Sequence, residues 1–217
     1  MNPRRRWCDF SVGMRTDSVL PREGWLSTLG DLHEDPQRFR ERLVVLRARA
    51  GDRAAFHELV ATYQQRLTYY VHRLVQDAHQ ARDILQDVWL DVFRTLGKLQ
   101  SPAAFRVWLY RIAHNHAVTH IRRQSVAAEA SEQLAADGEE IERWNDLDAL
   151  ENAELVHFAL NRLSVSHREV MTLRFLEGMD VKEIARVLEC SEGTAKSRLH
   201  YAKSALRRLI EEEWKNG

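Results

Sequence analysis

Near its C-terminal end the chain reads DVKEIARVLECSEGTAKSRL from Asp180 to Leu199. Asp180 is a candidate helix N-cap, and Glu183 follows three residues later, as in a capping box. The apolar positions after it predict a first helix, which Cys190 to Gly193 interrupt. Ser191 is a candidate N-cap for a second helix. The stretch therefore predicts two short helices joined by a tight turn, the pattern of a helix-turn-helix.

The second predicted helix has one apolar stripe and several polar faces. The stripe repeats at steps of four and three residues, which keeps one face against a domain core: Ala195, Leu199, Ala202, Leu206 and Leu209. Residues near the helix start would meet base edges if the helix entered a major groove, and later ones would reach phosphates. The residues off the stripe are Thr194, Lys196, Ser197, Arg198, His200, Tyr201, Lys203 and Arg208. A basic surface helix without a ligand is the alternative, which the paired and capped helices disfavour.

The composition favours helices in two small domains. The 217 residues are 44% hydrophobic and 29% charged, with only 9 glycines and 4 prolines. Arg4 to Arg6 precede no apolar run of signal-peptide type, and no stretch is long and apolar enough to span a bilayer, so we expect a cytoplasmic protein without membrane insertion. Cys8 and Cys190 lie far apart without a CxxC pair, which argues against a zinc site or a disulfide framework.

The formal net charge of zero conceals a strong asymmetry along the chain. Residues 1–124 hold 20 basic and 13 acidic side chains, whereas residues 125–156 hold 1 and 10. Residues 101–124 contain four arginines, three histidines and no acid. Local positive charge of this kind is typical of a nucleic-acid surface. The acidic stretch is typical of an extended, self-repelling linker.

Apolar residues at helical spacing predict an all-α fold. Helices are expected from Ala54 to Val75, from Ala78 to Gly97, and from Ser101-Pro102 into the basic segment that ends at Arg122-Arg123. After the linker we expect a helix that includes Phe158, and then a helix capped by Ser166 with Glu169 in an S-x-x-E box. The predicted domains are a partly ordered extension at 1–46, a helical domain at 47–124, an acidic linker at 125–152 and a helix-turn-helix domain at 153–213.

Three segments together resemble the sigma-70 family of bacterial transcription initiation factors, in particular its extracytoplasmic-function (ECF) group. The resemblance covers roughly residues 48–211. Residues 83–90, DILQDVWL, are similar to the region 2 helix that docks on the β′ clamp helices of RNA polymerase. Residues 105–115, FRVWLYRIAHN, are similar to the segment that melts the promoter and reads the −10 element. Residues 163–175 and 193–199 resemble region 4, which reads the −35 element.

The resemblance implies roles for individual residues. Core-polymerase binding is expected of Asp83, Gln86, Asp87 and Leu90. Binding of the −10 element is expected of Arg111, His114, Asn115, His116, Thr119, Arg122 and Arg123, with Asn115 where the family captures a flipped base. Binding of the −35 element is expected of Ser191, Glu192, Thr194, Lys196, Ser197, Arg198, His200 and Lys203, with Lys196 and Arg198 as first candidates for base contacts. Trp108 is in step with Phe105, Leu109 and Ile112, and we expect it to pack.

The implied function is that of a sigma factor that directs promoter-specific initiation and opens the strands by binding energy. It needs no catalytic residue, metal or cofactor. The implied partners are core RNA polymerase, through the β′ clamp helices and the β flap, promoter DNA and an anti-sigma factor. Residues 1–46 depart from the two-domain family core, and Met14 is an alternative start.

Two other functions compete with this interpretation. His114-Asn115-His116 has the letters of an HNH nuclease, and His116 with His120 at i, i+4 spacing offers two metal ligands. A nuclease site also needs a ββα context and further ligands, which a helical segment without acids does not supply. The second alternative is a repressor or activator that uses the helix-turn-helix alone. A melting segment next to a polymerase-docking helix has no purpose in such a protein.

Overall fold

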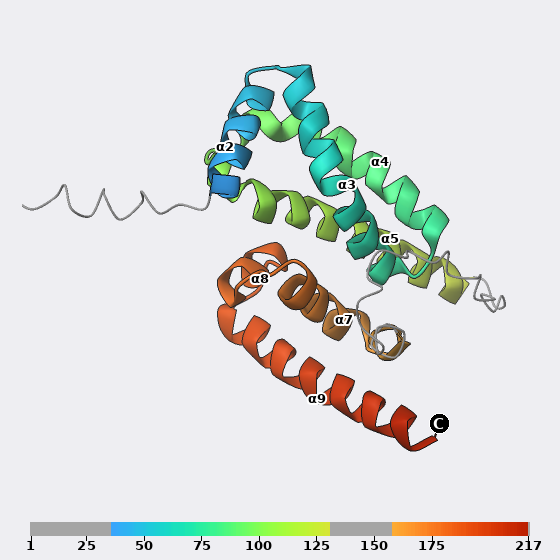
Figure 1. Ribbon diagram of the computed structural model, residues 1–217. Coiled ribbons are helices and arrows are strands. Elements are labelled where there is room, and N and C mark those ends of the chain that lie inside the picture. Colours follow the sequence, from blue (N-terminus) through green and yellow to red (C-terminus); the bar gives the residue numbers. More distant parts are fainter. Residues whose placement is uncertain (1–35, 131–157, 217) are drawn as a thin grey trace, which may run out of the picture. The chain divides into compact units, whose positions relative to one another are not determined.

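A computed structural model of the chain describes residues 36–130 and 158–216, which form helices and no strand. The predicted all-α fold is confirmed for these residues. The chain divides into residues 1–36 and a compact body from Gln37 to Gly217 (Figure 1). The predictions for the extension before Pro36 and for most of the acidic linker lie outside the described residues. No described helix has the length and apolar character needed to cross a bilayer.

Helix α2 (Pro36–Arg49) lies before the predicted start of the first domain at residue 47. It buries Val44, Val45 and Ala48 in the core. Its Glu41 also accepts a hydrogen bond of 2.5 Å from the Tyr63 hydroxyl. The end of the predicted, partly ordered extension is thus helical, and residues of α2 pack into the helical body.

Helices α3 (Arg53–Val75) and α4 (Ala78–Thr95) begin where aspartate side chains cap them. Asp52 accepts a hydrogen bond from the Ala55 amide at 3.1 Å, and Asp77 accepts one from the Gln80 amide at 2.9 Å. Each bond satisfies an amide that the first helical turn leaves without a partner. The two helices match the predicted segments.

Helix α5 (Phe105–Ala130) follows the short turns η2 (Leu96–Lys98) and η3 (Pro102–Ala104). Pro102 begins η3, as predicted for a first helical turn. The helix passes Arg123 and enters the segment that we expected to be linker. Residues 125–130 read SVAAEA, which lacks glycine and proline and is rich in alanine, so nothing in the sequence ends the helix there.

The C-terminal half contains α7 (Val165–Met171), the π-helical turn η4 (Thr172–Leu176), α8 (Val181–Val187) and α9 (Glu192–Asn216). The cap of α7 is Ser164 rather than Ser166, because its side chain accepts from the His167 amide. Ser166 lies inside the helix. Phe158 was expected in an apolar stripe but is 46% exposed.

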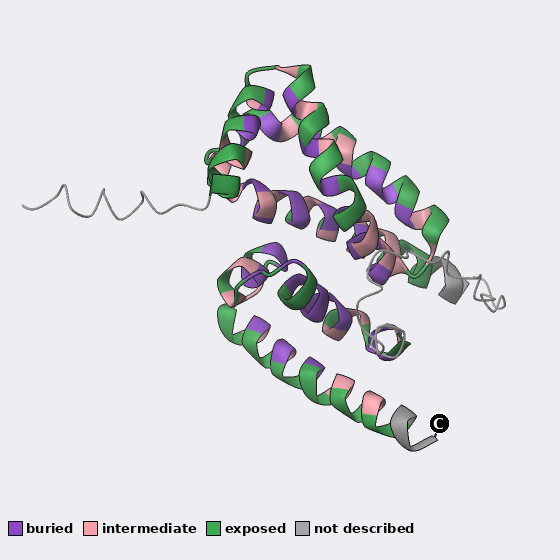
Figure 2. Ribbon diagram, in the orientation of Figure 1, coloured by how far each residue is buried: buried purple, intermediate pink, exposed green. Residues whose placement is uncertain are grey.

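The predicted helix-turn-helix is present as α8 and α9. Asp180 and Glu183 form the capping box, with bonds of 2.7 and 3.0 Å. Ser191 accepts a hydrogen bond from the Thr194 amide at 3.0 Å, as its predicted N-cap role requires. The turn residue with left-handed backbone is Glu189, at φ 51°, whereas Gly193 lies within α9. The predicted stripe on α9 faces the core, with Ala195, Leu199 and Ala202 buried (Figure 2).

Helices of the N-terminal half pack against helices of the C-terminal half. Helix α3 contacts α4, α5 and α7, and α5 also contacts α8. In Figure 1, α5 lies between α4 and the C-terminal helices. The basic segment on α5 is therefore close to α8.

Candidate nucleic-acid interface

Five of the predicted −10 residues form one exposed row along α5. Arg111, Asn115, Thr119, Arg122 and Arg123 follow spacings of three and four residues, which place them along one side of a helix. All five are exposed. The row has arginines at both ends, which can bind phosphates, and an amide and a hydroxyl between them, which can hydrogen-bond to unpaired bases.

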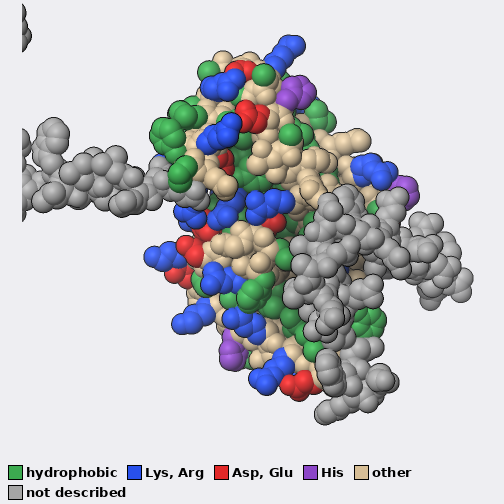
Figure 3. All heavy atoms as spheres, viewed as in Figure 1, with side chains coloured by type: hydrophobic (Ala, Val, Ile, Leu, Met, Phe, Trp, Pro, Cys, Tyr) green, Lys and Arg blue, Asp and Glu red, His purple; other side chains and the backbone are tan. Residues whose placement is uncertain are grey.

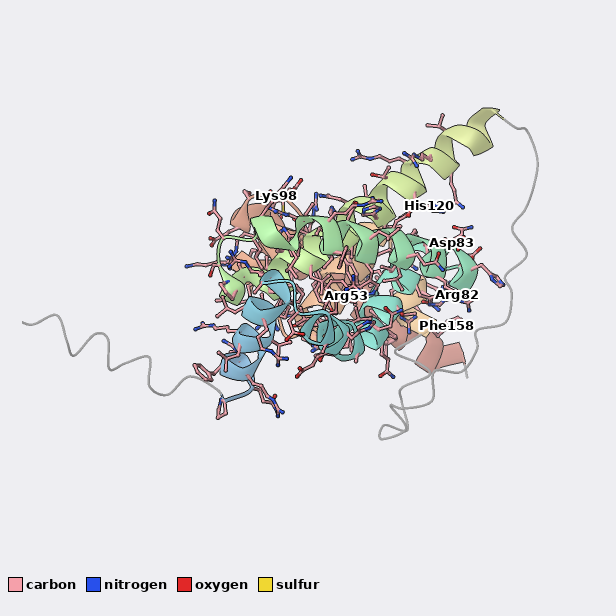
Figure 4. All side chains as sticks on the ribbon, turned by 90° about the horizontal axis from the view of Figure 1, so that it is seen from above. Arg53, Arg82, Asp83, Lys98, His120 and Phe158 are labelled. Carbon is pink, nitrogen blue, oxygen red and sulfur yellow. The ribbon has the colours of Figure 1, made fainter. Side chains whose placement is uncertain are left out.

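The two other predicted −10 residues have protein partners, as does Arg111 of the row, whose Nε lies 3.9 Å from Oε1 of Glu189. Nδ1 of His114 lies 2.7 Å from Oε1 of Glu169 on α7, and Nε2 of His116 lies 2.7 Å from Oδ2 of Asp91 on α4. His120 on α5 contacts Gln80 at 2.9 Å, and Figure 4 places His120 beside the part of α4 that carries Asp83. His116 and His120 thus face different partners. Within the described residues, no three His, Cys, Asp or Glu side chains group as metal ligands.

The aromatic residues of α5 belong to the packing. Trp108 is half-buried and lies 6.0 Å from Phe105 between ring centroids, as expected for a packing residue. Tyr110 is fully buried and makes an edge contact with Tyr70 at 5.2 Å. Burial and the nearby Glu177 carboxylate raise the pKa of Tyr110, so its hydroxyl stays protonated. The buried Tyr110 ring is therefore not available for stacking on a base.

The start of α9 presents the side chains predicted to read duplex DNA. Lys196, Ser197, His200 and Lys203 are exposed, and Ser191 and Glu192 flank the helix start. Thr194 and Arg198 are half-buried. Figure 3 shows Lys and Arg side chains gathered over the C-terminal helices on the visible face, with few carboxylates between them. A helix of this kind matches the shape and charge of a major groove.

The predicted polymerase-docking residues share the outer face of α4. Asp83, Gln86, Asp87 and Leu90 are exposed, while Ile84, Leu85 and Val88 fill the core. Neither Asp83 nor Asp87 forms an ion pair with a described residue. Figure 4 shows Asp83 next to Arg82 at the surface. Phe93, 62% exposed, continues the apolar part of this face next to Leu90, and the sequence analysis did not single it out.

A polar cluster that the sequence analysis missed joins the two halves. Tyr70 donates a hydrogen bond of 2.6 Å to Glu169, which also contacts His114. Burial is the main cause of the raised pKa of Tyr70, and Glu169 adds to it. Further pairs join Arg66 to Glu177 at 2.8 Å and Arg106 to Glu183 at 2.9 Å. No local sequence signal marks these pairs, because at least 55 positions separate the partners.

Family models match both halves. Residues 59–126 match sigma-70 region 2, and residues 153–206 match sigma-70 region 4. The chain belongs to the sigma-70 family. It is a sigma factor of the ECF group that directs promoter-dependent transcription initiation by RNA polymerase. A repressor built on the helix-turn-helix alone is disfavoured, because region 2 is also present.

The matches to two characterised relatives extend over nearly the whole length of each relative. The RNA polymerase sigma-H factor of Pseudomonas aeruginosa is 32% identical over 182 residues, which cover 79% of this chain and 94% of the relative. The ECF RNA polymerase sigma-E factor of Escherichia coli K12 is 29% identical over 180 residues, with 78% and 94% covered. The sigma factor is thus similar to both across regions 2 and 4.

Two solved structures share the fold of the sigma factor. RpoE of Bartonella quintana, in complex with the anti-sigma factor NepR, aligns with a TM-score of 0.64 at 22% identity, over 72% of this chain and 96% of the other. CnrH, in complex with the cytosolic domain of CnrY, aligns with a TM-score of 0.58 at 24% identity, over 79% and 97%.

Proposed function

We propose that the exposed row on α5 captures the opened −10 strand. The single observation that carries this assignment is the alignment of Arg111, Asn115, Thr119, Arg122 and Arg123 on one exposed side of an acid-free segment. Asn115 lies between Arg111 and Thr119, with Arg122 and Arg123 further along the row, so a base that leaves the stack can meet the amide while its phosphates meet arginines. His114 and His116 reach the strand only after they leave Glu169 and Asp91.

The start of α9 is proposed to read duplex DNA at the −35 element. Lys196 and Arg198 have side chains that can pair with guanine edges in the major groove. Ser197, His200 and Lys203 extend the same polar surface toward the phosphates. Ser191, Glu192 and Thr194 surround the helix N-terminus, whose amides favour phosphate oxygens.

The outer face of α4 is proposed to dock on the β′ clamp helices of core polymerase. Asp83 and Asp87 offer carboxylates to a basic partner, Gln86 offers an amide, and Leu90 offers apolar area. In a complex, such a face would bury the apolar side chain at the centre of the interface and keep the polar groups at the rim. The β flap is the proposed partner of the second domain.

Sigma factors are DNA-binding regulators, and we infer that this one performs no covalent chemistry. Strand opening is then driven by the free energy of capturing unpaired bases, without a nucleophile, metal or cofactor. We propose the cytoplasm, where core polymerase acts, as its location. We also propose that an anti-sigma factor holds the chain inactive, as the fold shared with an anti-sigma complex suggests. We propose a first domain at 47–124, against which α2 packs, and a second domain at 153–213.

In vitro transcription tests the proposal. Bacterial core polymerase is given a pooled promoter library with and without the full chain. We expect new transcripts whose promoters share one −35 sequence and one −10 sequence. The variant Asn115→Ala should lose these transcripts while it still binds core polymerase. If the chain added no new transcripts, the proposed function would be contradicted. If Asn115→Ala gave the same transcripts as the wild type, the assignment of the α5 row would be contradicted.

A further inference from the structure

Helix α2 carries an apolar stripe on its outer face. Phe39, Leu43 and Leu46 are 55%, 46% and 47% exposed, although all three are large hydrophobic side chains. At about 100° per residue they fall within a sector of about 60° around the helix axis. None of the three belongs to the described core or packs against it. The buried residues of α2 lie on the opposite side of the helix (Figure 2): Val44, Val45 and Ala48.

Arginines flank the stripe on both sides. By the same helical spacing, one side carries Arg40 and Arg47. The other side carries Arg38, Arg42 and Arg49. On the face seen in Figure 3, hydrophobic side chains and Lys or Arg side chains lie next to one another around α2. The outer face of α2 therefore has an apolar centre and two cationic edges.

Acidic side chains do not neutralise this face. Helix α2 contains five arginines and one glutamate. That glutamate, Glu41, lies on the core side, where it accepts the hydrogen bond from the Tyr63 hydroxyl. Asp52 accepts bonds of 2.9 and 2.6 Å from Arg47, at the C-terminal end of the helix. Arg38 and Arg40 are exposed near the start of the helix, beside Phe39. The positive charge is thus strongest where the stripe begins.

The pattern distinguishes between the surfaces that could cover this face. A second copy of the chain would bring two sets of arginines together, which repel each other. A nucleic acid would pair with the arginines through its phosphates but would leave the apolar stripe without a partner. An anionic bilayer satisfies both parts, because its phosphates lie level with the arginines and its acyl chains begin just below them. A straight stripe along a helix about 21 Å long also fits a flat surface.

We propose that α2 binds an anionic membrane surface. The helix lies in the plane of the membrane, with Phe39, Leu43 and Leu46 at the boundary between headgroups and acyl chains and the arginines at the lipid phosphates. Its 14 residues are fewer than the roughly 20 needed to span a bilayer, so the contact is peripheral. Three apolar side chains and a few charges give a reversible attachment. The proposal does not depend on the functions proposed for α4, α5 and α9.

Flotation of the full chain with lipid vesicles tests the proposal. One set of vesicles contains phosphatidylglycerol and phosphatidylcholine in equal parts, and the other contains phosphatidylcholine alone. The chain should float with the anionic vesicles and stay behind with the neutral ones. Added salt should release it, because screening weakens the attraction between arginines and lipid phosphates.

Two substitutions on the outer face separate the apolar and the cationic contributions. Phe39→Gln should reduce partitioning onto anionic vesicles about fivefold, because the ring no longer leaves water. Phe158→Gln is the matched control, since Phe158 is 46% exposed and lies outside α2. Arg40→Gln should also reduce partitioning about fivefold. Its control is Arg207→Gln on α9, where the arginine side chain is 82% exposed. Both controls should partition like the wild type.

A fluorescent probe reports whether the stripe enters the membrane boundary. Leu43→Cys is labelled with an environment-sensitive dye in a chain that also carries Cys8→Ser and Cys190→Ser. Its emission should shift to the blue on anionic vesicles. The same dye at Glu58→Cys, an exposed position of α3, should show no shift. A shift at position 43 alone would support insertion of the α2 stripe, which attraction by charge does not produce.

Three results would overturn the proposal. A wild-type chain that does not float with anionic vesicles would leave an acidic protein surface as the occupant of α2. Flotation that Phe39→Gln and Arg40→Gln do not reduce would assign membrane binding to another part of the chain. An unshifted probe at position 43 would reduce the contact to adsorption by charge. Transcription with core polymerase keeps this test apart from the proposed function, because Phe39→Gln should initiate like the wild type.

Discussion

The Tyr70 hydroxyl donates a hydrogen bond of 2.6 Å to Oε1 of Glu169, 99 positions further along the chain. The same oxygen lies 2.7 Å from Nδ1 of His114. Tyr70 is fully buried and Glu169 is nearly so. One carboxylate of the second domain thus links α3 to a residue of the candidate −10 surface.

Tyr70→Phe should reduce the free energy of unfolding by about 1 to 3 kcal/mol, because a buried carboxylate loses a donor. Urea unfolding followed by circular dichroism measures the change. Tyr201→Phe, at a side chain 63% exposed, is the control and should stay within about 0.5 kcal/mol of the wild type. Equal stability of Tyr70→Phe and the wild type would mean that Glu169 needs no bond from Tyr70.

Local sequence patterns predicted the helices, but they did not predict the contacts between residues far apart in the sequence. The capping box at Asp180 and the stripe from Ala195 need only near neighbours, and both are present. The end of α5 was placed too early because a change of charge was interpreted as a change of structure, although the alanines after Ser125 still favour a helix. The pairing of Glu169 with His114 depends on how the two halves pack, which spacing along the chain does not encode.

The capping box of α8 should contribute measurably to stability. Asp180→Ala removes the acceptor for the Glu183 amide and should cost about 1 kcal/mol. Asp180→Asn keeps an acceptor and should cost only a fraction of that. Thermal unfolding of the wild type, Asp180→Asn and Asp180→Ala should give melting temperatures that decrease in this order. A melting temperature of Asp180→Ala equal to that of Asp180→Asn would show that the cap is not needed.

Arginines of the α5 row should act through phosphates. Arg122→Ala should lower the slope of log affinity for single-stranded DNA against log salt by about 0.7, independently of sequence. Titrations at several salt concentrations give the slope. The exposed Arg38→Ala on α2 is the control and should leave it unchanged. An effect of Arg122→Ala on one sequence only would instead indicate base contact.

Arg198 should act on sequence rather than on overall affinity. Arg198→Ala should weaken binding to the preferred −35 sequence by about 1 to 3 kcal/mol and relax the preference at one base pair. Holoenzyme binding to −35 variants at each position measures this. A uniform loss across all variants would assign Arg198 to the phosphate backbone.

The face of α4 should determine binding to core polymerase. Asp87→Lys places a cation opposite the proposed basic partner. It should lower the affinity for core polymerase about tenfold or more, since a tenfold loss corresponds to about 1.4 kcal/mol. Glu58→Lys, at an exposed position of α3, makes the same change outside the proposed face. Equal losses for both variants would show that total charge, rather than this face, determines binding.

The pKa of His72 is lowered, first by burial and second by the charge of Arg73, with Asp77 acting in the opposite direction. The unfolded chain therefore binds a proton at His72 more readily than the folded chain. The unfolding free energy should fall as the pH drops from about 6.5 toward the lowered pKa. Below that pKa the contribution of His72 no longer changes with pH. His72→Gln should flatten that part of the curve of unfolding free energy against pH. An unchanged curve would contradict the burial of the neutral ring.

Photocrosslinking from two positions tests whether α5 and α9 contact different elements of one promoter. A photoreactive amino acid replaces Thr119 on α5 or Lys203 on α9, and each variant is assembled with core polymerase on a promoter selected by the wild-type chain. We expect crosslinks from position 119 to the non-template strand of the −10 element and from position 203 to the −35 duplex of the same DNA. Crosslinks from both positions to one element, or from position 119 to protein alone in the open complex, would contradict it.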